Sequence, residues 1–178
     1  WNRICVEGKK GILGDMFQYK FSVIMPLYNV ENFFAEAVES VIKQTIGFRE
    51  NIQIILVNDG SPDRVEDLCL RYKEDYPENI IYVSKENGGV SSARNEGIKH
   101  AQGKYINFFD ADDRWELDAF EKAYAFLEQH NEVDAVACRH RFFGKRDGFV
   151  HPLDYKFRQA KDELVDIKSE HTYIQMAV

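Results

Sequence analysis

Short apolar runs alternate with amphipathic segments along most of this chain. The apolar runs predict strands at residues 21–25, 52–57, 80–83 and 105–109. Apolar residues that recur every three or four positions predict helices over residues 30–42, 65–76, 90–101 and 117–129. The strands are apolar at consecutive rather than alternate positions, as expected when helices cover both faces of a parallel sheet. The pattern therefore predicts an α/β fold, a mostly parallel sheet with helices on both faces.

Proline and turn residues set the expected boundaries of two elements. Pro26 is expected to end the first strand, because proline lacks a backbone N–H. After the second strand, Gly60 allows a left-handed turn. Ser61 is the expected N-cap of the following helix, with Pro62 at its first position.

The periodic pattern covers only the middle of the chain. Residues 1–20 show no sustained period and are expected to be an N-terminal extension. The domain is expected to span residues 21–143, with one more strand near residues 134–138. Residues 144–178 are charged, with few apolar positions, and are expected to be a separate C-terminal segment.

Polar residues follow three of the predicted strands. Tyr28 and Asn29 come after the first strand, Asn58 and Asp59 after the second, and the acidic run 110–113 after the fourth. In open α/β sheets, ligands bind beyond the carboxyl ends of the strands, where the strand order reverses. These clusters therefore predict a binding site at that edge.

The acidic run Asp110-Ala111-Asp112-Asp113 is the strongest candidate for chemistry. A carboxylate and a phosphate oxygen about 4 Å apart repel by roughly 4 kcal/mol at an effective dielectric near 20, and a divalent cation between them reverses the sign. Asp110 and Asp112 have one residue between them, so both can reach one hard cation if the chain turns there. The alternative is a strand followed by an acidic helix cap.

Three further candidates each have a structural alternative. Tyr28 can stack on a nucleobase or simply pack its loop. Asp59, with Asn58 beside it, can accept from a base N–H or belong to an ordinary turn. Gly88, through its backbone N–H, and Arg94 can meet phosphate or neighbouring carboxylates, or form a glycine turn with a solvated arginine. Neither a Gly-x-Gly-x-x-Gly fingerprint nor a P-loop is present.

Composition narrows the partners and the compartment. The net charge is −7 with acidic and basic residues interspersed, which argues against binding of nucleic acid or of an anionic membrane surface. The three cysteines lack the spacing of a disulfide framework or a zinc site, so a reducing, cytoplasmic compartment fits best. No apolar run approaches the roughly 20 residues that span a bilayer.

From Phe21 to about Phe143, the chain resembles the nucleotide-binding half of glycosyltransferase family 2, the inverting enzymes of the Rossmann-like GT-A fold. The matching motifs, in the family's order and spacing, are residues 22–29, 55–61, 87–95 and 110–113. The resemblance covers about two thirds of the chain.

The resemblance implies a nucleotide-diphosphate sugar, most often a UDP-sugar, bound across the strand ends. The residues it implies for nucleotide binding are Pro26 and Tyr28 at the base, Asn58 and Asp59 at the base edge, Gly88, Arg94 and Asp110. Asp112, with Asp110, would bind Mn²⁺ or Mg²⁺ on the diphosphate. Arg94 would help order the acidic cluster. Many family members carry two consecutive acidic residues where this chain has Asn58-Asp59. The resemblance therefore does not define the contact with the nucleobase.

The implied reaction is displacement at the anomeric carbon, with inversion, by an acceptor hydroxyl in the synthesis of a cell-surface polysaccharide. The family's general base is an acidic residue downstream of the Asp-x-Asp pattern. Asp154, Asp162 and Glu163 are candidates on composition only, so the base is expected outside the chain. This suggests a truncated chain whose residues 144–178 hold part of the acceptor side, and whose missing parts attach it to the inner face of a membrane.

Two alternatives stand beside this expectation. The chain can be a donor-binding module, or an inactive fragment without the base. It can also be a sugar nucleotidyltransferase, although such enzymes use a glycine-rich loop with Arg and Lys after the first strand, which Pro26-Leu27-Tyr28-Asn29 does not provide. The donor sugar, the acceptor and the oligomeric state are not predicted.

Overall fold

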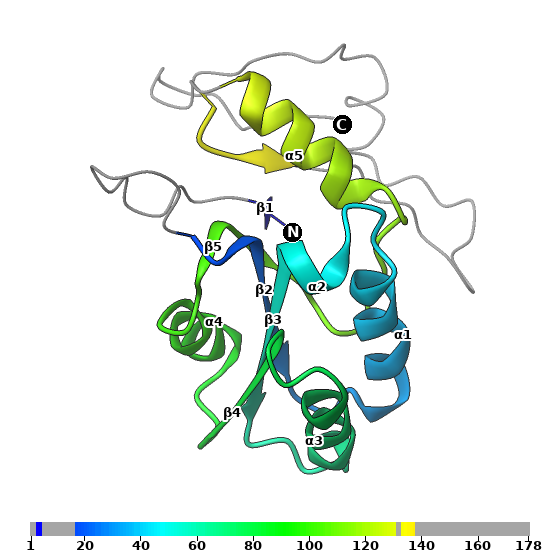
Figure 1. Ribbon diagram of the computed structural model, residues 1–178. Coiled ribbons are helices and arrows are strands. Elements are labelled where there is room, and N and C mark those ends of the chain that lie inside the picture. The colour runs from blue at the N-terminus through cyan, green and yellow to red at the C-terminus, as the bar shows by residue number, and fades with distance from the viewer. Residues whose placement is uncertain (1–2, 5–16, 131–132, 138–178) are drawn as a thin grey trace, which may run out of the picture.

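The computed structural model describes residues 3–4, 17–130 and 133–137 of the chain (Figure 1). The strands are β1 (Arg3–Ile4), β2 (Tyr19–Leu27), β3 (Ile52–Asp59), β4 (Ile80–Lys85), β5 (Gly103–Phe108) and β6 (Val136–Ala137). The helices are α1 (Glu31–Ile42), α2 (Phe48–Asn51), α3 (Val65–Asp75), α4 (Val90–Ile98) and α5 (Ala119–Gln129).

The sheet is mostly parallel, as predicted. Its strand order is β4-β3-β2-β5-β1-β6. The pairs β2–β3, β3–β4 and β2–β5 are parallel, while the two-residue strands β1 and β6 add antiparallel pairs beside β5. The chain moves outward from β2 through β3 to β4 and then returns to β5 on the other side of β2. The strand order therefore reverses between β2 and β5.

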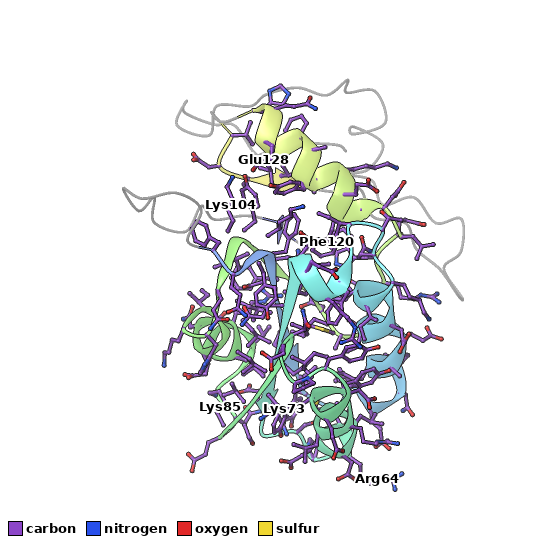
Figure 2. The ribbon with its side chains drawn as sticks, in the orientation of Figure 1. Arg64, Lys73, Lys85, Lys104, Phe120 and Glu128 are labelled. Atoms are coloured by element: carbon purple, nitrogen blue, oxygen red, sulfur yellow. The ribbon has the colours of Figure 1, made fainter. Side chains whose placement is uncertain are left out.

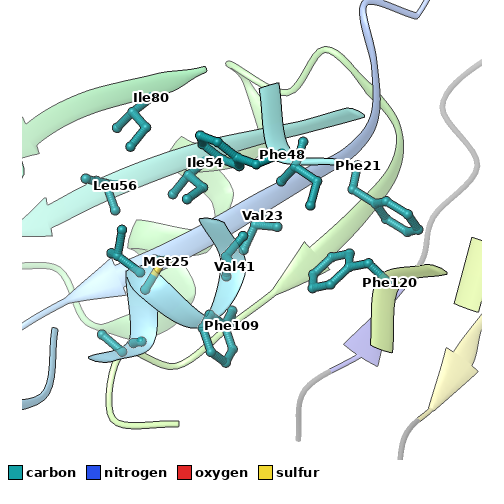
Figure 3. Close-up of a cluster of buried hydrophobic side chains, with 14 of the residues drawn as sticks. Phe21, Val23, Met25, Val41, Phe48, Ile54, Leu56, Ile80, Phe109 and Phe120 are labelled. Atoms are coloured by element: carbon teal, nitrogen blue, oxygen red, sulfur yellow. The ribbon is translucent and has the colours of Figure 1, made fainter. Parts of the chain in front are cut away.

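Helices cover both faces of the sheet, which confirms that prediction. Figure 1 shows α4 on one side and α1 and α3 on the other. The α4 side holds a small buried cluster of Ile24, Ile55, Val57 and Ala93. The opposite side holds the main core, in which Val23, Met25 and Phe109 lie with Val41 of α1 and Phe120 of α5 (Figure 3).

The prediction that Pro26 ends the first strand is wrong, because β2 continues through Pro26 to Leu27. The carbonyl oxygen of Ile24 accepts the Phe109 N–H at 2.9 Å on the β5 side. Backbone groups two residues apart point to the same side of a strand, so the nitrogen of Pro26 also faces this side. By that point β5 has ended at Phe108, and the missing N–H removes no ladder bond. Pro26 stays in register with Val57 of β3.

The prediction that Ser61 caps the second long helix is also wrong. Helix α3 begins at Val65, and no side chain caps it at the preceding residue. The Ser61 hydroxyl instead accepts the Asn29 N–H at 2.7 Å and donates to the Asp63 carboxylate at 2.6 Å. The hydroxyl therefore links the loops after β2 and β3. The left-handed turn expected at Gly60 is confirmed, with φ at +67°.

We predict that Gly97→Ala destabilises the protein. A Cβ at Gly97 would lie 2.3 Å from Cγ2 of Ile24, so α4 packs on β2 too closely for alanine. Overpacking costs about 1 to 3 kcal/mol, whereas alanine in an open helix interior gains about 1 kcal/mol over glycine. Denaturant unfolding should therefore show a lower free energy of unfolding for Gly97→Ala than for the wild type, whereas helix propensity alone predicts a higher one.

The matched control for this variant is Ser91→Ala, at an exposed position of the same helix. It should leave the free energy of unfolding within about 0.5 kcal/mol of the wild type. A Gly97→Ala protein as stable as the wild type would contradict the close packing of α4 on β2.

Candidate functional site

The predicted polar residues come together at the carboxyl edge of the sheet. Asn58 is in register with Leu27 of β2, and Asp59 with Lys85 of β4. Tyr28 follows β2 directly, and Asp110 follows β5 after Phe109. The strands involved are neighbours in the sheet, so the clusters predicted from the sequence share one edge.

Asp59 is the buried centre of this edge. Its Oδ1 accepts from Lys85 Nζ at 2.6 Å and from the Gly88 N–H at 3.0 Å, and its Oδ2 accepts the Gly89 N–H at 2.8 Å. The residue is only 3% exposed. The carboxylate therefore fixes the loop between β4 and α4. The Gly88 N–H, for which the sequence predicted either phosphate or a neighbouring carboxylate as the partner, donates to the carboxylate of Asp59.

Lys85 is a residue of this edge that the sequence analysis missed. It ends the edge strand β4 and forms an ion pair with Asp59, with 21% of its side chain exposed. Figure 2 shows Lys85 near the end of β4, well away from Lys104 and Glu128, which pair at the opposite end of the molecule. A single lysine at the end of a strand belongs to no sequence motif. Only the pairing of β3 with β4, which places Lys85 opposite Asp59, reveals its partner.

The ion pair determines the ionisation of Asp59. Burial raises the pKa of this carboxyl, but the hydrogen bonds from Lys85, Gly88 and Gly89 outweigh it, and the pKa lies below its ordinary value. Asp59 is therefore a stable anion at neutral pH. It can accept hydrogen bonds but has no proton to donate.

Asn58 is also used within the protein. Its Oδ1 accepts the Ser61 N–H at 2.8 Å, and its Nδ2 donates to the Tyr82 hydroxyl at 3.0 Å. It is 4% exposed. These contacts fix the turn after β3, and a base contact by Asn58 stays a prediction.

Arg94 and Asp110 form an ion pair across the point where the strand order reverses. Arg94 Nη2 donates to Asp110 Oδ1 at 2.7 Å, and the two side chains are 28% and 36% exposed. The guanidinium carbon lies 5.8 Å from the ring centre of Phe108. Arg94 thus anchors the start of the acidic run, as the resemblance implied.

Asp112 is exposed, and within the described residues its carboxylate has no hydrogen-bond or ion-pair partner. Carboxylate oxygens are the ligands that Mg²⁺ and Mn²⁺ prefer. In the part of the chain that the structure describes, no three or more His, Cys, Asp or Glu side chains gather as a metal cage. A cation held by Asp110 and Asp112 would have to take its other oxygens from phosphate and water, which is how Mg²⁺ usually binds.

Tyr28 and Pro26 lie at the end of β2. Tyr28 is 54% exposed, so part of this residue is accessible to a ligand. The next residue, Asn29, has a positive φ of 56°, which turns the chain sharply after the ring. Stacking on a base stays a prediction.

Several predictions from the sequence concern residues outside the described ones. These are the base candidates Asp154, Asp162 and Glu163 and the segment 144–178. The domain limits at residues 20 and 143 are likewise untested, although β2 already begins at Tyr19. Among the described helices, none has the length and apolar character needed to cross a bilayer.

Comparison with known proteins gives concordant matches. The model of the family described as "Glycosyl transferase family 2" matches residues 22–177. The minor teichoic acid biosynthesis protein GgaB of Bacillus subtilis is 51% identical over 159 residues, which are 89% of this chain and 17% of that protein. GgaA of the same organism is 37% identical over 159 residues, 86% of this chain and 35% of GgaA.

Solved structures show the same similarity. Residues 1–349 of Staphylococcus aureus TarS in complex with UDP give a TM-score of 0.64 at 29% identity, covering 71% of this chain and 37% of that one. The mannosyltransferase PcManGT from Pyrobaculum calidifontis, in complex with GDP-Man and Mn²⁺, gives 0.63 at 26% identity, covering 70% and 36%. The chain therefore spans well under half the length of these relatives.

We predict that Asp59→Asn destabilises the protein by about 2 to 3 kcal/mol at neutral pH, since hydrogen bonds to a buried charge are lost. A carboxyl whose pKa is lower in the folded state stabilises the fold above its unfolded pKa of about 3.9 and loses this effect as the pH falls through the folded value. The difference between wild type and variant should therefore shrink below about pH 4. Urea unfolding across this pH range measures it.

The control is Asp75→Asn, at an exposed position near the end of α3. It should change stability by less than about 0.5 kcal/mol at every pH. If the Asp59→Asn difference stayed constant down to the acid transition, the ion pair with Lys85 would not be the source of the stabilisation.

Proposed function

The chain belongs to glycosyltransferase family 2 and has the GT-A fold that its motifs predicted, and we propose that it forms the donor-binding part of a metal-dependent, inverting glycosyltransferase. The proposed donor is a nucleotide-diphosphate sugar, with UDP as the nucleotide. The proposed product is a cell-surface polysaccharide of the teichoic acid type, made on the cytoplasmic side.

One observation carries the proposal. Arg94 holds Asp110 at the carboxyl edge of the sheet, while Asp112, two residues on, is exposed without a partner in the described chain. The position of Asp112 is therefore constrained through Asp110, while its negative charge is not compensated by the described residues. Such a carboxylate suits a cation that arrives with a diphosphate. The complexes of TarS with UDP and UDP-GlcNAc, and of PcManGT with GDP-Man and Mn²⁺, support this reading.

The nucleoside is proposed to bind between the ends of β2 and β3. Tyr28 would stack on the base and Pro26 would border it. Asp59 Oδ2 accepts only the Gly89 N–H among the described donors, which leaves it a second lone pair for a base N–H. Because Lys85 and the glycine loop hold this carboxylate as an anion, it would select a base edge that donates.

The diphosphate is proposed to lie beside the acidic run. Asp112 and Asp110 would hold Mn²⁺ or Mg²⁺, which when bound supplies positive charge to the departing diphosphate. Arg94 occupies Oδ1 of Asp110, so Oδ2 remains for the ribose or the cation. Arg94 thereby keeps Asp110 oriented before any ligand is present.

The transfer itself needs an acceptor hydroxyl and a base. The hydroxyl oxygen would bond to the anomeric carbon as the bond from that carbon to the diphosphate oxygen breaks, and a base would take the hydroxyl proton. The base is proposed among acidic residues downstream, with Asp154, Asp162 and Glu163 as candidates in this chain or another residue of a longer protein. The names of GgaB and GgaA support a teichoic acid acceptor.

The second candidate is a module that binds the donor without transferring the sugar. The observation in its favour is that the chain spans only 17% and 35% of the length of GgaB and GgaA. Binding of UDP without release of sugar from a UDP-sugar would favour it. The family match argues against the nucleotidyltransferase alternative.

We predict that UDP with Mn²⁺ raises the melting temperature. A ligand at one hundred times its Kd stabilises a protein by about 2.7 kcal/mol, which for a domain of this size is about 5 to 10 °C. Asp112→Asn should abolish the part of the shift that depends on Mn²⁺, because the amide has lost the charge that attracts the cation. Differential scanning fluorimetry with and without chelator measures both effects.

Asp75→Asn again serves as the control and should keep the full shift. Asp112 is exposed and has no partner among the described residues, so its variant should melt close to the wild type without ligand. An identical Mn²⁺-dependent shift in Asp112→Asn and wild type would refute the proposed cation site.

A further inference from the structure

The segment from Ala111 to Asp118 carries the exposed Asp112 and consists of turns and irregular chain rather than a helix or strand. A segment without secondary structure needs other contacts to fix its path. Its start is fixed at Asp110 by Arg94 and at Phe109 by the bond to Ile24. The remaining question is what fixes it after Asp112.

Gln44, just after α1, holds the far side of this segment. Its Nε2 donates to the carbonyl oxygen of Glu116 at 2.7 Å and to that of Ser40 at 3.0 Å, and its Oε1 accepts the Phe120 N–H at 3.0 Å. Gln44 is 4% exposed. One buried amide therefore connects α1 to the segment and to the first turn of α5.

Ser40 and Thr45 add two further contacts. Ser40 Oγ accepts the Trp115 N–H at 3.1 Å while donating to the carbonyl of Ala37 at 2.7 Å. The Thr45 N–H donates to the Leu117 carbonyl at 2.9 Å. Trp115, Glu116 and Leu117 are thus bonded in succession to the end of α1.

The Trp115 ring strengthens this attachment. It lies 5.7 Å from the ring of Phe109 and 5.4 Å from that of Phe120, between the end of β5 and the start of α5. Aromatic pairs at such distances contribute beyond their buried area. The backbone bonds and the ring together fix the chain three residues after Asp112.

We propose that Gln44 and Ser40 are positioning residues that set where Asp112 stands relative to Asp110. The inference rests on the proposed function, since it concerns the cation site of that function. Neither side chain is placed to touch a ligand; each acts through the backbone of residues 115–120. Without them, the segment would keep its tie at Asp110, the Thr45–Leu117 bond and the Trp115 ring contacts, but lose the bonds at the Trp115 N–H, the Glu116 carbonyl and the Phe120 N–H.

Gln53 provides a matched control at the opposite edge of the sheet. It is also buried, at 1% exposed. Its Nε2 donates to the His100 carbonyl at 3.2 Å, and its Oε1 accepts from Ser22 Oγ at 2.6 Å and the Gln102 N–H at 3.0 Å. Gln53→Ala thus removes a buried amide with a similar number of hydrogen bonds to that of Gln44. Gln53 lies near the start of β3, at the opposite edge of the sheet from Asp112.

The test measures UDP binding by calorimetry in the full chain at a series of Mn²⁺ concentrations and in chelator. We expect both Gln44→Ala and Gln53→Ala to lower the melting temperature. Only Gln44→Ala should raise the Mn²⁺ concentration needed for half-maximal UDP binding, by about tenfold or more, as for other residues that orient metal ligands. UDP binding in chelator should stay within about twofold in both variants.

A second pair keeps the test decisive if Gln44→Ala fails to fold. Ser40→Ala removes the acceptor for the Trp115 N–H and should shift the Mn²⁺ dependence in the same direction. Ser40→Thr keeps the hydroxyl and should restore the wild-type dependence. Rescue by threonine separates positioning from a general loss of packing.

The outcomes distinguish this inference from the function on which it rests. A wild type without Mn²⁺-dependent UDP binding overturns the proposed function and this inference with it. A wild type that responds to Mn²⁺, with Gln44→Ala and Ser40→Ala responding equally, overturns the positioning role alone. Equal shifts of the half-maximal Mn²⁺ concentration in Gln44→Ala and Gln53→Ala also overturn it, because a general loss of stability would then explain the effect.

Discussion

The structure depends on the balance of charge at the carboxyl edge of the sheet. Parallel strands bring Asp59, Asp110 and Asp112 to the same edge, where carboxylates repel one another and repel phosphate. Two of them have a cation within the protein: Lys85 pairs with Asp59, and Arg94 with Asp110. Asp112 has none in the described chain. The protein's own cations, Lys85 and Arg94, thus compensate the charges of Asp59 and Asp110, and the charge of Asp112 is left for a ligand.

The two ion pairs differ in environment, and this difference separates their roles. Asp59 is buried, so removing its charge breaks hydrogen bonds to a desolvated group, which costs about 2 to 3 kcal/mol. The pair therefore fixes the loop that follows β4. Asp110 and Arg94 are partly exposed, and an exposed pair is worth about 1 kcal/mol or less. Its value lies in orientation, because it holds one carboxylate oxygen and leaves the other open.

The sequence predicted the elements better than the contacts between them. The long strands and helices carry clear periods, whereas α2 has only four residues and β1 and β6 two each, too short for any period. Pro26 was misread because its nitrogen faces a side where β5 has ended. Lys85 and Gln44 were missed because their partners lie 26 and 72 to 76 residues away. Such contacts depend on how the strands and helices are arranged in space, and a local sequence pattern does not predict that arrangement.

Topology also explains why the acidic run is supported from both faces of the sheet. The strand order reverses between β2 and β5, so the helix that leads into β5, α4, lies on the opposite face from α1. Arg94 reaches the run from α4, while Gln44 and Ser40 reach it from the end of α1. Only residues 111–114 lie between these anchors. An unpaired carboxylate costs little while water solvates it, so Asp112 can be exposed on a short span that is fixed at both ends. Anchors on both faces therefore constrain the spacing between Asp110 and Asp112 more closely than an anchor on one face alone.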